Sequence, residues 1–205
     1  STDDRHYITE VAGALPYLLQ VAASELWEAY SEGADDAGEH WHQTGQRLLD
    51  KAAMTLTDTW RLWSSATRKA FTAVALADIA TMLEQRDFFT LPLIRDARRD
   101  CGPELRALRK QGFVSEDEDA PTGYCVRPKA FLWWLTDEVV RTVRDETAFE
   151  EWLRQQELGI MLTMCEKNKL GKAIHSIGGM LEGGAKTLIE AAAKGVGEGF
   201  GKVST

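Results

Sequence analysis

Two histidines, His40 and His42, form the pair in this chain that most resembles a metal-ligand motif. Zinc sites in proteins combine three or four His, Cys, Asp or Glu ligands. Both histidines fall in a predicted helix, where residues two positions apart point in different directions and cannot share an ion. Because no nearby cysteine or third histidine completes the set, we predict no metal site.

Nucleophilic catalysis has no supporting pattern. No serine lies in a Gly-x-Ser-x-Gly turn, and Cys125 falls in a predicted strand, where we interpret it as a small core residue. The acidic run 116–119 is typical of a solvated loop. The chain also contains no Gly-x-x-x-x-Gly-Lys-Ser/Thr loop, which is the motif that cradles nucleotide phosphates. We therefore predict no catalytic residue, no enzyme activity and no cofactor bound by this chain alone.

A group of basic side chains forms a candidate interaction surface. Its members are Arg95, Arg98, Arg99, Arg106, Arg109 and Lys110. Arginines on a helix in the major groove could read guanine edges. However, residues 65–140 carry a net charge of −1, and DNA affinity depends largely on basic groups that displace counterions from phosphates. We do not expect DNA binding, and predict contact with an acidic surface of the same protein or of a partner.

Charge divides the 205-residue chain, whose overall net charge is −8. Residues 167–205 carry six lysines against three glutamates, a net of +3, whereas residues 1–166 carry −11. Nine of the 17 glycines fall between residues 171 and 201. We therefore predict a compact acidic body followed by a glycine-rich basic tail, with a boundary near residue 165. The three widely spaced cysteines indicate a reducing compartment, and no apolar run is long enough to span a membrane.

Apolar spacing predicts three helices at the start of the chain. Asp3 and Asp4 can cap the first of them. The second is expected over about 15–31 and the third over 37–62, each with apolar residues three and four positions apart. Such helices can bury their apolar faces against one another. We predict a small helical bundle over residues 1–63.

A different pattern follows from Ser64, which can cap a helix ending near Leu83. Short helical stretches come next, the last of them opened by Gly102, and then two alternating segments predict a β-hairpin. Three helices, a hairpin and a further helix is the order of a winged-helix domain. The sequence thus predicts a mainly α fold with one short hairpin and a helical C-terminal extension. The predicted divisions are a bundle (1–63), a winged helix (64–141), a connecting helix (142–166) and a tail (167–205).

The segment 7–20, with Gly13 before Pro16, resembles the lid segment of signal-transduction P-loop ATPases and their archaeal-type AAA relatives. In that family a similar turn starts a helix beside the bound nucleotide, and a winged-helix domain follows the lid. The resemblance implies that Gly13 and Pro16 lie near nucleotide. It further implies that ATP or ADP is bound only with a nucleotide-binding core outside this chain, upstream of Ser1.

The tail has a narrow apolar stripe at helical spacing. Its large and small apolar positions include Leu170, Ile174, Ile177, Leu181, Leu188 and Ala192. The five glycines between 171 and 184 cost a helix about 1 kcal/mol each, so the tail cannot be a stable helix alone in water. It therefore needs something to pack on. We expect its own body or neighbouring copies, with self-association, and keep a membrane interface as the alternative.

These observations lead to one functional prediction and two alternatives. The leading prediction is a non-catalytic regulatory and oligomerisation fragment of a nucleotide-switched signalling ATPase. In it, the missing nucleotide-binding core moves the lid and the winged helix and thereby frees the tail. The first alternative is a membrane-active effector acting through residues 167–205, and the second is a winged-helix DNA-binding protein. The predicted location is the cytoplasm, with peripheral membrane attachment as an alternative.

Overall fold

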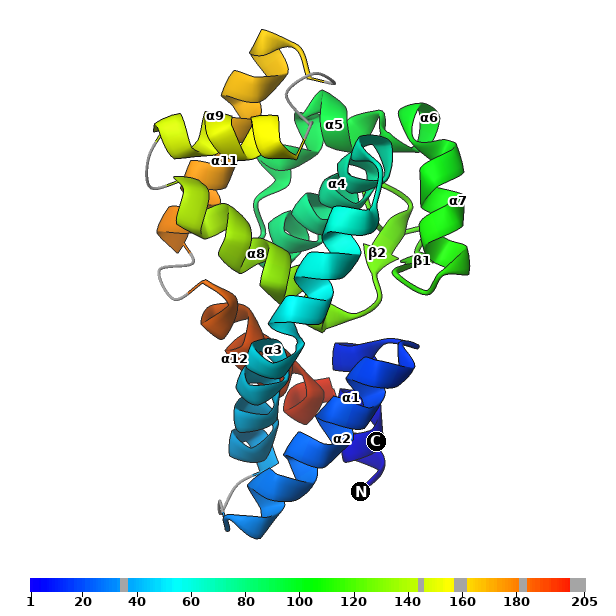
Figure 1. Ribbon diagram of the computed structural model, residues 1–205, viewed down its shortest axis with the longest axis vertical. Coiled ribbons are helices and arrows are strands. Elements are labelled where there is room, and N and C mark those ends of the chain that lie inside the picture. The colour runs from blue at the N-terminus through cyan, green and yellow to red at the C-terminus, as the bar shows by residue number, and fades with distance from the viewer. Residues whose placement is uncertain (34–36, 144–145, 157–161, 181–183, 200–205) are drawn as a thin grey trace.

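The computed structural model describes residues 1–33, 37–143, 146–156, 162–180 and 184–199 (Figure 1). These residues form α-helices joined by short turns, one short 3-10 helix and a single two-stranded hairpin. The predicted mainly α fold with a small β-hairpin is confirmed.

Three helices at one end of the molecule form the bundle (α1–α3). They are α1 (Thr2–Ala12), α2 (Pro16–Ser31) and α3 (Ala37–Leu62), close to the predicted bounds. The predicted cap of α1 was wrong. Ser1 is the N-cap and accepts a hydrogen bond from the Asp4 backbone N–H, while the Asp4 carboxylate accepts one from the Ser1 nitrogen. This is a reciprocal capping box, in which Asp4 is the third residue of the helix.

The same Asp4 carboxylate holds the three bundle helices together. Its Oδ1 atom accepts hydrogen bonds from the Tyr30 hydroxyl of α2, at 2.9 Å, and from the Trp41 indole N–H of α3, at 3.0 Å. Burial opposes ionisation, but the hydrogen bonds from Ser1, Trp41 and Tyr30 outweigh it and lower the pKa of Asp4 to about 2.

The hairpin unit (α4–α8) occupies the other end of the molecule in Figure 1. Its elements are α4 (Ser65–Met82), the 3-10 helix η1 (Arg86–Thr90), α5 (Pro92–Arg95), α6 (Ala97–Asp100), α7 (Gly102–Lys110), β1 (Val114–Glu116), β2 (Tyr124–Val126) and α8 (Lys129–Val143). Ser64 is the N-cap of α4, as predicted. The strands are antiparallel and pair Val114 with Val126. The hairpin expected after Gly112 is therefore present.

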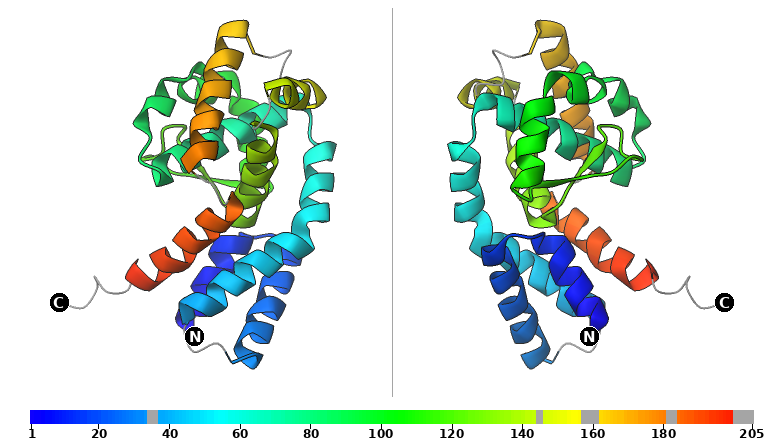
Figure 2. Two further views of the ribbon diagram at one scale, coloured as in Figure 1. Left: turned by 90° about the vertical axis from the view of Figure 1, so that its left-hand side faces the viewer. Right: turned by 90° about the vertical axis from the view of Figure 1, so that its right-hand side faces the viewer.

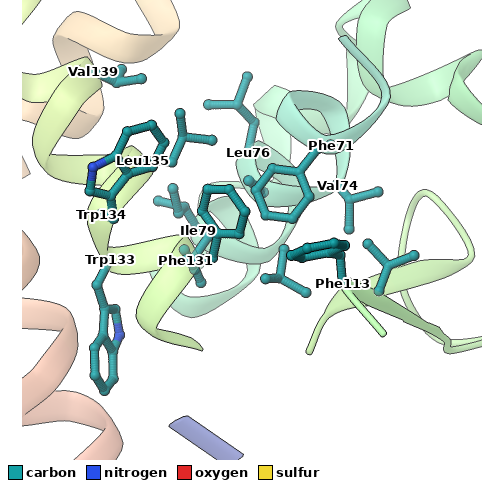
Figure 3. Close-up of a cluster of buried hydrophobic side chains, with 14 of the residues drawn as sticks. Phe71, Val74, Leu76, Ile79, Phe113, Phe131, Trp133, Trp134, Leu135 and Val139 are labelled. Atoms are coloured by element: carbon teal, nitrogen blue, oxygen red, sulfur yellow. The ribbon is translucent and has the colours of Figure 1, made fainter. Parts of the chain in front are cut away.

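Aromatic rings fill the core of the hairpin unit. Phe71 of α4 and Phe131 of α8 have ring centroids 4.8 Å apart, and Phe113 meets Phe131 edge to face (Figure 3). Trp60 and Trp63, at the end of α3, pack on the same rings. Because its last turn enters this core, α3 joins the bundle to the hairpin unit through apolar contacts as well as through the chain.

Asp78 of α4 is a buried carboxylate in the hairpin unit. Its Oδ2 atom accepts a hydrogen bond from the Val126 N–H at 2.8 Å and lies 3.7 Å from the Lys129 ammonium. Burial raises the pKa of Asp78 to about 6, since it outweighs the opposing effects of Lys129 and the Val126 hydrogen bond; Asp117 adds a small further increase. Ionisation of Asp78 therefore weakens the folded state as pH rises through about 6.

We predict that Asp78→Asn removes this pH dependence. The folded pKa lies above the unfolded value, so the stabilisation is complete below about pH 4 and is lost as pH rises through 6. Relative to wild type, the free energy of unfolding of Asp78→Asn is expected to improve by about 2–3 kcal/mol from pH 4 to pH 7. Urea unfolding at pH 4 and at pH 7 measures this change in the free energy of unfolding, and Asp87→Asn, at an exposed position, is the control. Parallel pH profiles for wild type and Asp78→Asn would contradict the prediction.

The C-terminal third differs from the predicted connecting helix and continuous tail helix. Instead, α8 runs on to Val143, and α9 (Glu146–Gln155), α11 (Met164–Met180) and α12 (Ala185–Gly199) follow as separate helices. Gly184, with φ +59°, precedes α12 and breaks the expected helix. The tail packs on its own body, which was one of the two expected partners: α11 packs on α8, and α12 packs on α3, α8 and α1.

None of the described helices is both long enough and apolar enough to traverse a bilayer.

Candidate functional site

The candidate site is the place where the bundle, the hairpin unit and α12 meet. α12 begins beside α8 and runs across the bundle, contacting α3 and α1 (Figure 1, Figure 2). We call the surface of α1, α3 and α8 that α12 covers the α12 groove. α12 is thus in contact with both halves of the body at once.

Two neighbouring tryptophans give α8 two different buried faces. Trp134 packs on Trp60 and Phe131 in the core of the hairpin unit. Trp133 points away from that cluster, toward the bundle and the tail (Figure 3). Its side chain is fully buried. Because a helix turns by about 100° per residue, adjacent large apolar residues can serve two different cores. Trp133 is the part of α8 that enters the α12 groove.

Gly45 of α3 forms the floor of the groove. A Cβ atom at this position would lie 2.7 Å from Cγ2 of Ile189 in α12. It would also lie 2.9 Å from the Tyr7 hydroxyl and 3.4 Å from Cζ3 of Trp133. Real Cβ atoms do not approach other atoms as closely as the first two distances, so α12 can come this near to α3 only because residue 45 has no side chain.

Tyr7 of α1 lies beside Gly45 and is fully buried. Its hydroxyl donates a hydrogen bond to the Trp41 carbonyl oxygen, and its ring stacks on the Trp41 indole with centroids 5.7 Å apart. Burial raises the pKa of Tyr7, so the hydroxyl stays protonated and remains a donor. The groove wall on the α1 side is therefore apolar, with its one polar group satisfied.

Among the described side chains of α12, which end at residue 193, the buried ones that face the groove are Ala185, Leu188, Ile189 and Ala193. Of the predicted tail stripe, Leu170, Ile174 and Leu188 are buried and Ala192 is partly buried. The side chain of Ile177 and the whole of Leu181 lie outside the described residues. Ile189 was missed because the buried face of α12 is wider than the predicted stripe and includes the neighbours of Leu188 and Ala192.

Asp137 of α8 fixes the start of α12. Its Oδ1 atom accepts a hydrogen bond from the Ala185 N–H at 2.7 Å. A Cβ at Gly184 would lie 2.5 Å from the same oxygen, so glycine is needed there both for its positive φ and for space. Asp137 thus caps a helix that begins 48 residues later in the chain, and a negative charge there also favours the helix dipole.

We predict that Asp137→Ala loosens α12. Removing the cap leaves the Ala185 N–H without its acceptor and is expected to cost about 1 kcal/mol. The amides of α12 should then exchange with solvent about fivefold faster, while those of α4 keep the wild-type rate. Asp137→Asn is the matched control, because its side-chain oxygen can still accept the bond. Equal exchange of α12 in wild type and Asp137→Ala would contradict the cap.

The predicted lid turn lies at the same junction. Gly13 is buried, and a Cβ there would lie 3.1 Å from the backbone nitrogen of Pro128, where β2 passes into α8. Pro16 is exposed in the first turn of α2. The close approach that Gly13 allows in this structure is to the chain's own backbone, and the nucleotide-proximal role of both residues stays a prediction.

The six predicted cations lie on α5, α6 and α7, and four of them have partners of their own. Arg95 pairs with Asp96 at 2.6 Å, and Arg99 pairs with Asp100 at 2.9 Å. Arg109 pairs with Glu116, across to the hairpin. Arg98 lies 6.0 Å from the centre of the Tyr124 ring. The remaining two, Arg106 and Lys110, are exposed on α7.

The chemistry of the junction is that of packing and capping. Within the described ranges, no group of three or more His, Cys, Asp or Glu side chains is placed to hold a metal ion. Comparison with known proteins found no matching family model, no matching curated protein and no matching solved structure. The contacts of α12 and of the Gly13 turn are the features of the junction that join the two halves of the body.

Proposed function

We propose that this chain is a non-catalytic regulatory part of a nucleotide-switched signalling ATPase, in which α12 is held against the body and released when the two halves of the body move apart. The bundle acts as the lid, and the hairpin unit acts as a winged helix. The nucleotide-binding core of the same protein or of its neighbours supplies ATP or ADP binding. The released tail then associates with further copies.

One observation carries this proposal: α12 contacts the bundle through α1 and α3, and the hairpin unit through α8. If α12 were bound to only one rigid body, its contact surface would not change when two bodies move relative to each other. α12 instead loses part of its contact surface whenever the bundle turns relative to α8. The free energy of α12 docking is therefore coupled to the relative position of the two halves, which is the property that a conformational switch requires.

The Gly13 turn supports the same reading. It packs closely against the Arg127–Pro128 backbone of the hairpin unit. A nucleotide-driven shift of α1 and α2 would therefore displace the start of α8. The Trp133 face of that helix meets α12. The chain thus has a continuous packed path from the predicted lid turn to the tail.

The first test concerns the missing core. The isolated chain, incubated with ATP and magnesium, is expected to show no turnover above background, because it has no phosphate-binding loop. The coding sequence upstream of Ser1 is expected to contain such a loop. Turnover by the isolated chain, or a start codon directly before Ser1, would sink the proposal.

The second test concerns the switch. A disulfide between Gly45→Cys and Ile189→Cys in one chain would hold α12 in its groove. In the full-length protein we expect this lock to abolish nucleotide-dependent signalling output while leaving nucleotide binding unchanged, with output restored by reductant. A locked protein that signals normally would show that tail release has no part in the switch.

A second candidate function, a membrane-active effector, is favoured by the solvent-facing side of the tail. Lys169 and Lys172 of α11 and Lys186 of α12 are exposed, whereas the apolar side of α12 is buried. Insertion into lipid would therefore follow release from the groove. Leakage of anionic vesicles by the Asp137→Ala chain would favour it, and the absence of both leakage and vesicle binding would remove it.

DNA binding gains no support from the arrangement of the basic side chains. Arg95, Arg99 and Arg109 already pair with neighbouring carboxylates. A phosphate would have to displace those carboxylates, which lowers the gain from each contact. We propose contact with protein for this surface, and a cytoplasmic location for the chain.

A further inference from the structure

We infer that the α12 groove is also a binding site for α12 of a second copy, so that the chain self-associates by exchanging its last helix. This inference deepens the proposed function, on which it rests for the event that releases α12. It names the partner of the freed helix as another copy of this chain, and the site as the groove formed by α1, α3 and α8.

The groove is specific for the sequence of α12. The absent side chain of Gly45 admits Ile189, and Asp137 caps the backbone at Ala185. Both features recognise α12 whether it belongs to the same chain or to another, because both of these contacts lie between α12 and the groove. Exchange therefore rebuilds the same contacts between two copies and leaves no apolar face exposed in either.

Gly184, the residue directly before α12, can act as the hinge of the exchange. It has φ +59° when α12 occupies its own groove, and glycine can leave that conformation at little steric cost. A change of backbone conformation at this one residue redirects α12 as a unit, which is what the exchange of a helix between two copies requires.

Lipid is the competing occupant of the freed apolar face, but it reproduces fewer of the contacts. A membrane would cover Leu188 and Ile189 while leaving the groove, with Trp133 and Tyr7, open to water. A second copy covers both surfaces at once. Burial of apolar area on both sides favours the exchange of α12 over its transfer to lipid.

Two single-cysteine chains test the exchange directly. One carries Gly45→Cys and the other carries Ile189→Cys, both with Cys101, Cys125 and Cys165 replaced by serine or alanine so that the added cysteine is the only one in each chain. Ile189→Cys removes the crowding Cγ2 atom, and because a Cβ at Gly45 would lie 2.7 Å from that atom, the two Cβ atoms lie within about 4.2 Å of each other, in the range of a disulfide. Both chains also carry Tyr7→Phe, which removes the hydroxyl that would lie 2.9 Å from the new Cβ. Neither chain can form this bond alone. A mixed disulfide can form only when α12 of one copy occupies the groove of the other.

We expect the mixture to give a covalent heterodimer, separable without reductant, whose yield rises with protein concentration. Ala191→Cys, on the exposed side of α12, replaces Ile189→Cys in the control and is expected to give about tenfold less product. A chain that carries both Gly45→Cys and Ile189→Cys reports whether α12 occupies the groove of its own chain. If that chain forms an internal disulfide and the mixture gives no heterodimer, the proposed exchange of α12 between copies is wrong. The proposed release of α12 as a switch is then unaffected. No disulfide in either would overturn the groove itself.

Discussion

Trp133→Ala is expected to lower the free energy of unfolding by about 3–5 kcal/mol and to free α12 in the folded protein. Trp133 is fully buried and lies beside Gly45, under the helix that carries Ile189. Replacing the indole with a methyl group opens a cavity under α12, and the contacts that join α8 to the bundle are lost at the same time. Urea unfolding measures the global loss, and amide exchange under native conditions measures the freedom of α12.

Trp134→Ala is the matched control, since it removes the same side chain from the next residue. Trp134 faces Trp60 and Phe131 in the core of the hairpin unit, so a similar loss of global stability is expected. The two variants differ in where protection is lost. Exchange of α12 relative to α4 is expected to rise in Trp133→Ala and to keep its wild-type ratio in Trp134→Ala. The same ratio in both variants would show that Trp133 does not hold α12.

The strength of the α12 docking suits a releasable contact. Burial of Leu188 and Ile189 contributes about 1.5–3 kcal/mol each, and the Asp137 cap about 1 kcal/mol. Ordering the helix backbone opposes these gains at about 1–2 kcal/mol per residue, so α12 is docked less firmly than its burial alone would suggest. Allosteric coupling typically supplies 1–3 kcal/mol. A movement at the junction that removes some of the contacts is therefore sufficient to shift α12 from mostly docked to mostly free.

Local sequence rules predicted the bundle and the hairpin unit well. Ser64 as a cap, Pro16 in a first turn and Gly112 before the first strand act through their immediate neighbours, so their effects can be read along the chain. Even the cap of α1 followed a local rule: Ser1 with Asp4 three residues later forms a capping box.

The tail could not be predicted in the same way, because its order depends on distant residues. The apolar spacing continues across Gly184, whose positive φ precedes the new helix, and the Asp137 carboxylate that caps this helix lies 48 residues earlier in the chain. Gly45 shows no periodic or motif signal of its importance, since its role is to leave space for Ile189. The one available signal was the Trp133-Trp134 pair, because two adjacent large apolar residues on a helix imply two separate buried faces.

For the basic cluster, the sequence indicated the charges but not all of the partners that pair with them. Counting Arg95, Arg99 and Arg109 as cations was correct, but their availability depended on neighbours. Asp96 and Asp100 lie next to the first two in the sequence and pair with them, so these contacts could have been predicted. The partner of Arg109 is Glu116, which is brought close only by the turn between α7 and the hairpin.

Gly13→Ala is expected to cost about 2–4 kcal/mol and to loosen α12 although residue 13 lies outside the groove. Gly13 has φ +59° and ψ −140°, a conformation that L-residues with a side chain avoid. The added methyl would also lie 3.1 Å from the Pro128 nitrogen, a backbone atom that cannot rotate away. Relief of both strains requires α1 to move from the start of α8. Thermal unfolding measures the stability, and amide exchange measures the release of α12.

Gly33→Ala separates the two causes, because Gly33 has φ +78° but nothing within 4 Å of its added Cβ. It bears the cost of a positive φ alone, about 1–2 kcal/mol. The ψ of −140° at Gly13 adds a conformational cost of its own, so the exchange of α12, and not the size of the stability loss, identifies the effect of the contact at Pro128. A larger loss in Gly13→Ala, accompanied by faster exchange of α12 that Gly33→Ala does not show, would establish that contact between the lid turn and α8 is transmitted to the tail. Equal losses of stability in the two variants, with wild-type exchange of α12 in both, would contradict the first step of the proposed path. The crowding at Pro128 would then have no effect beyond the strain of the turn itself.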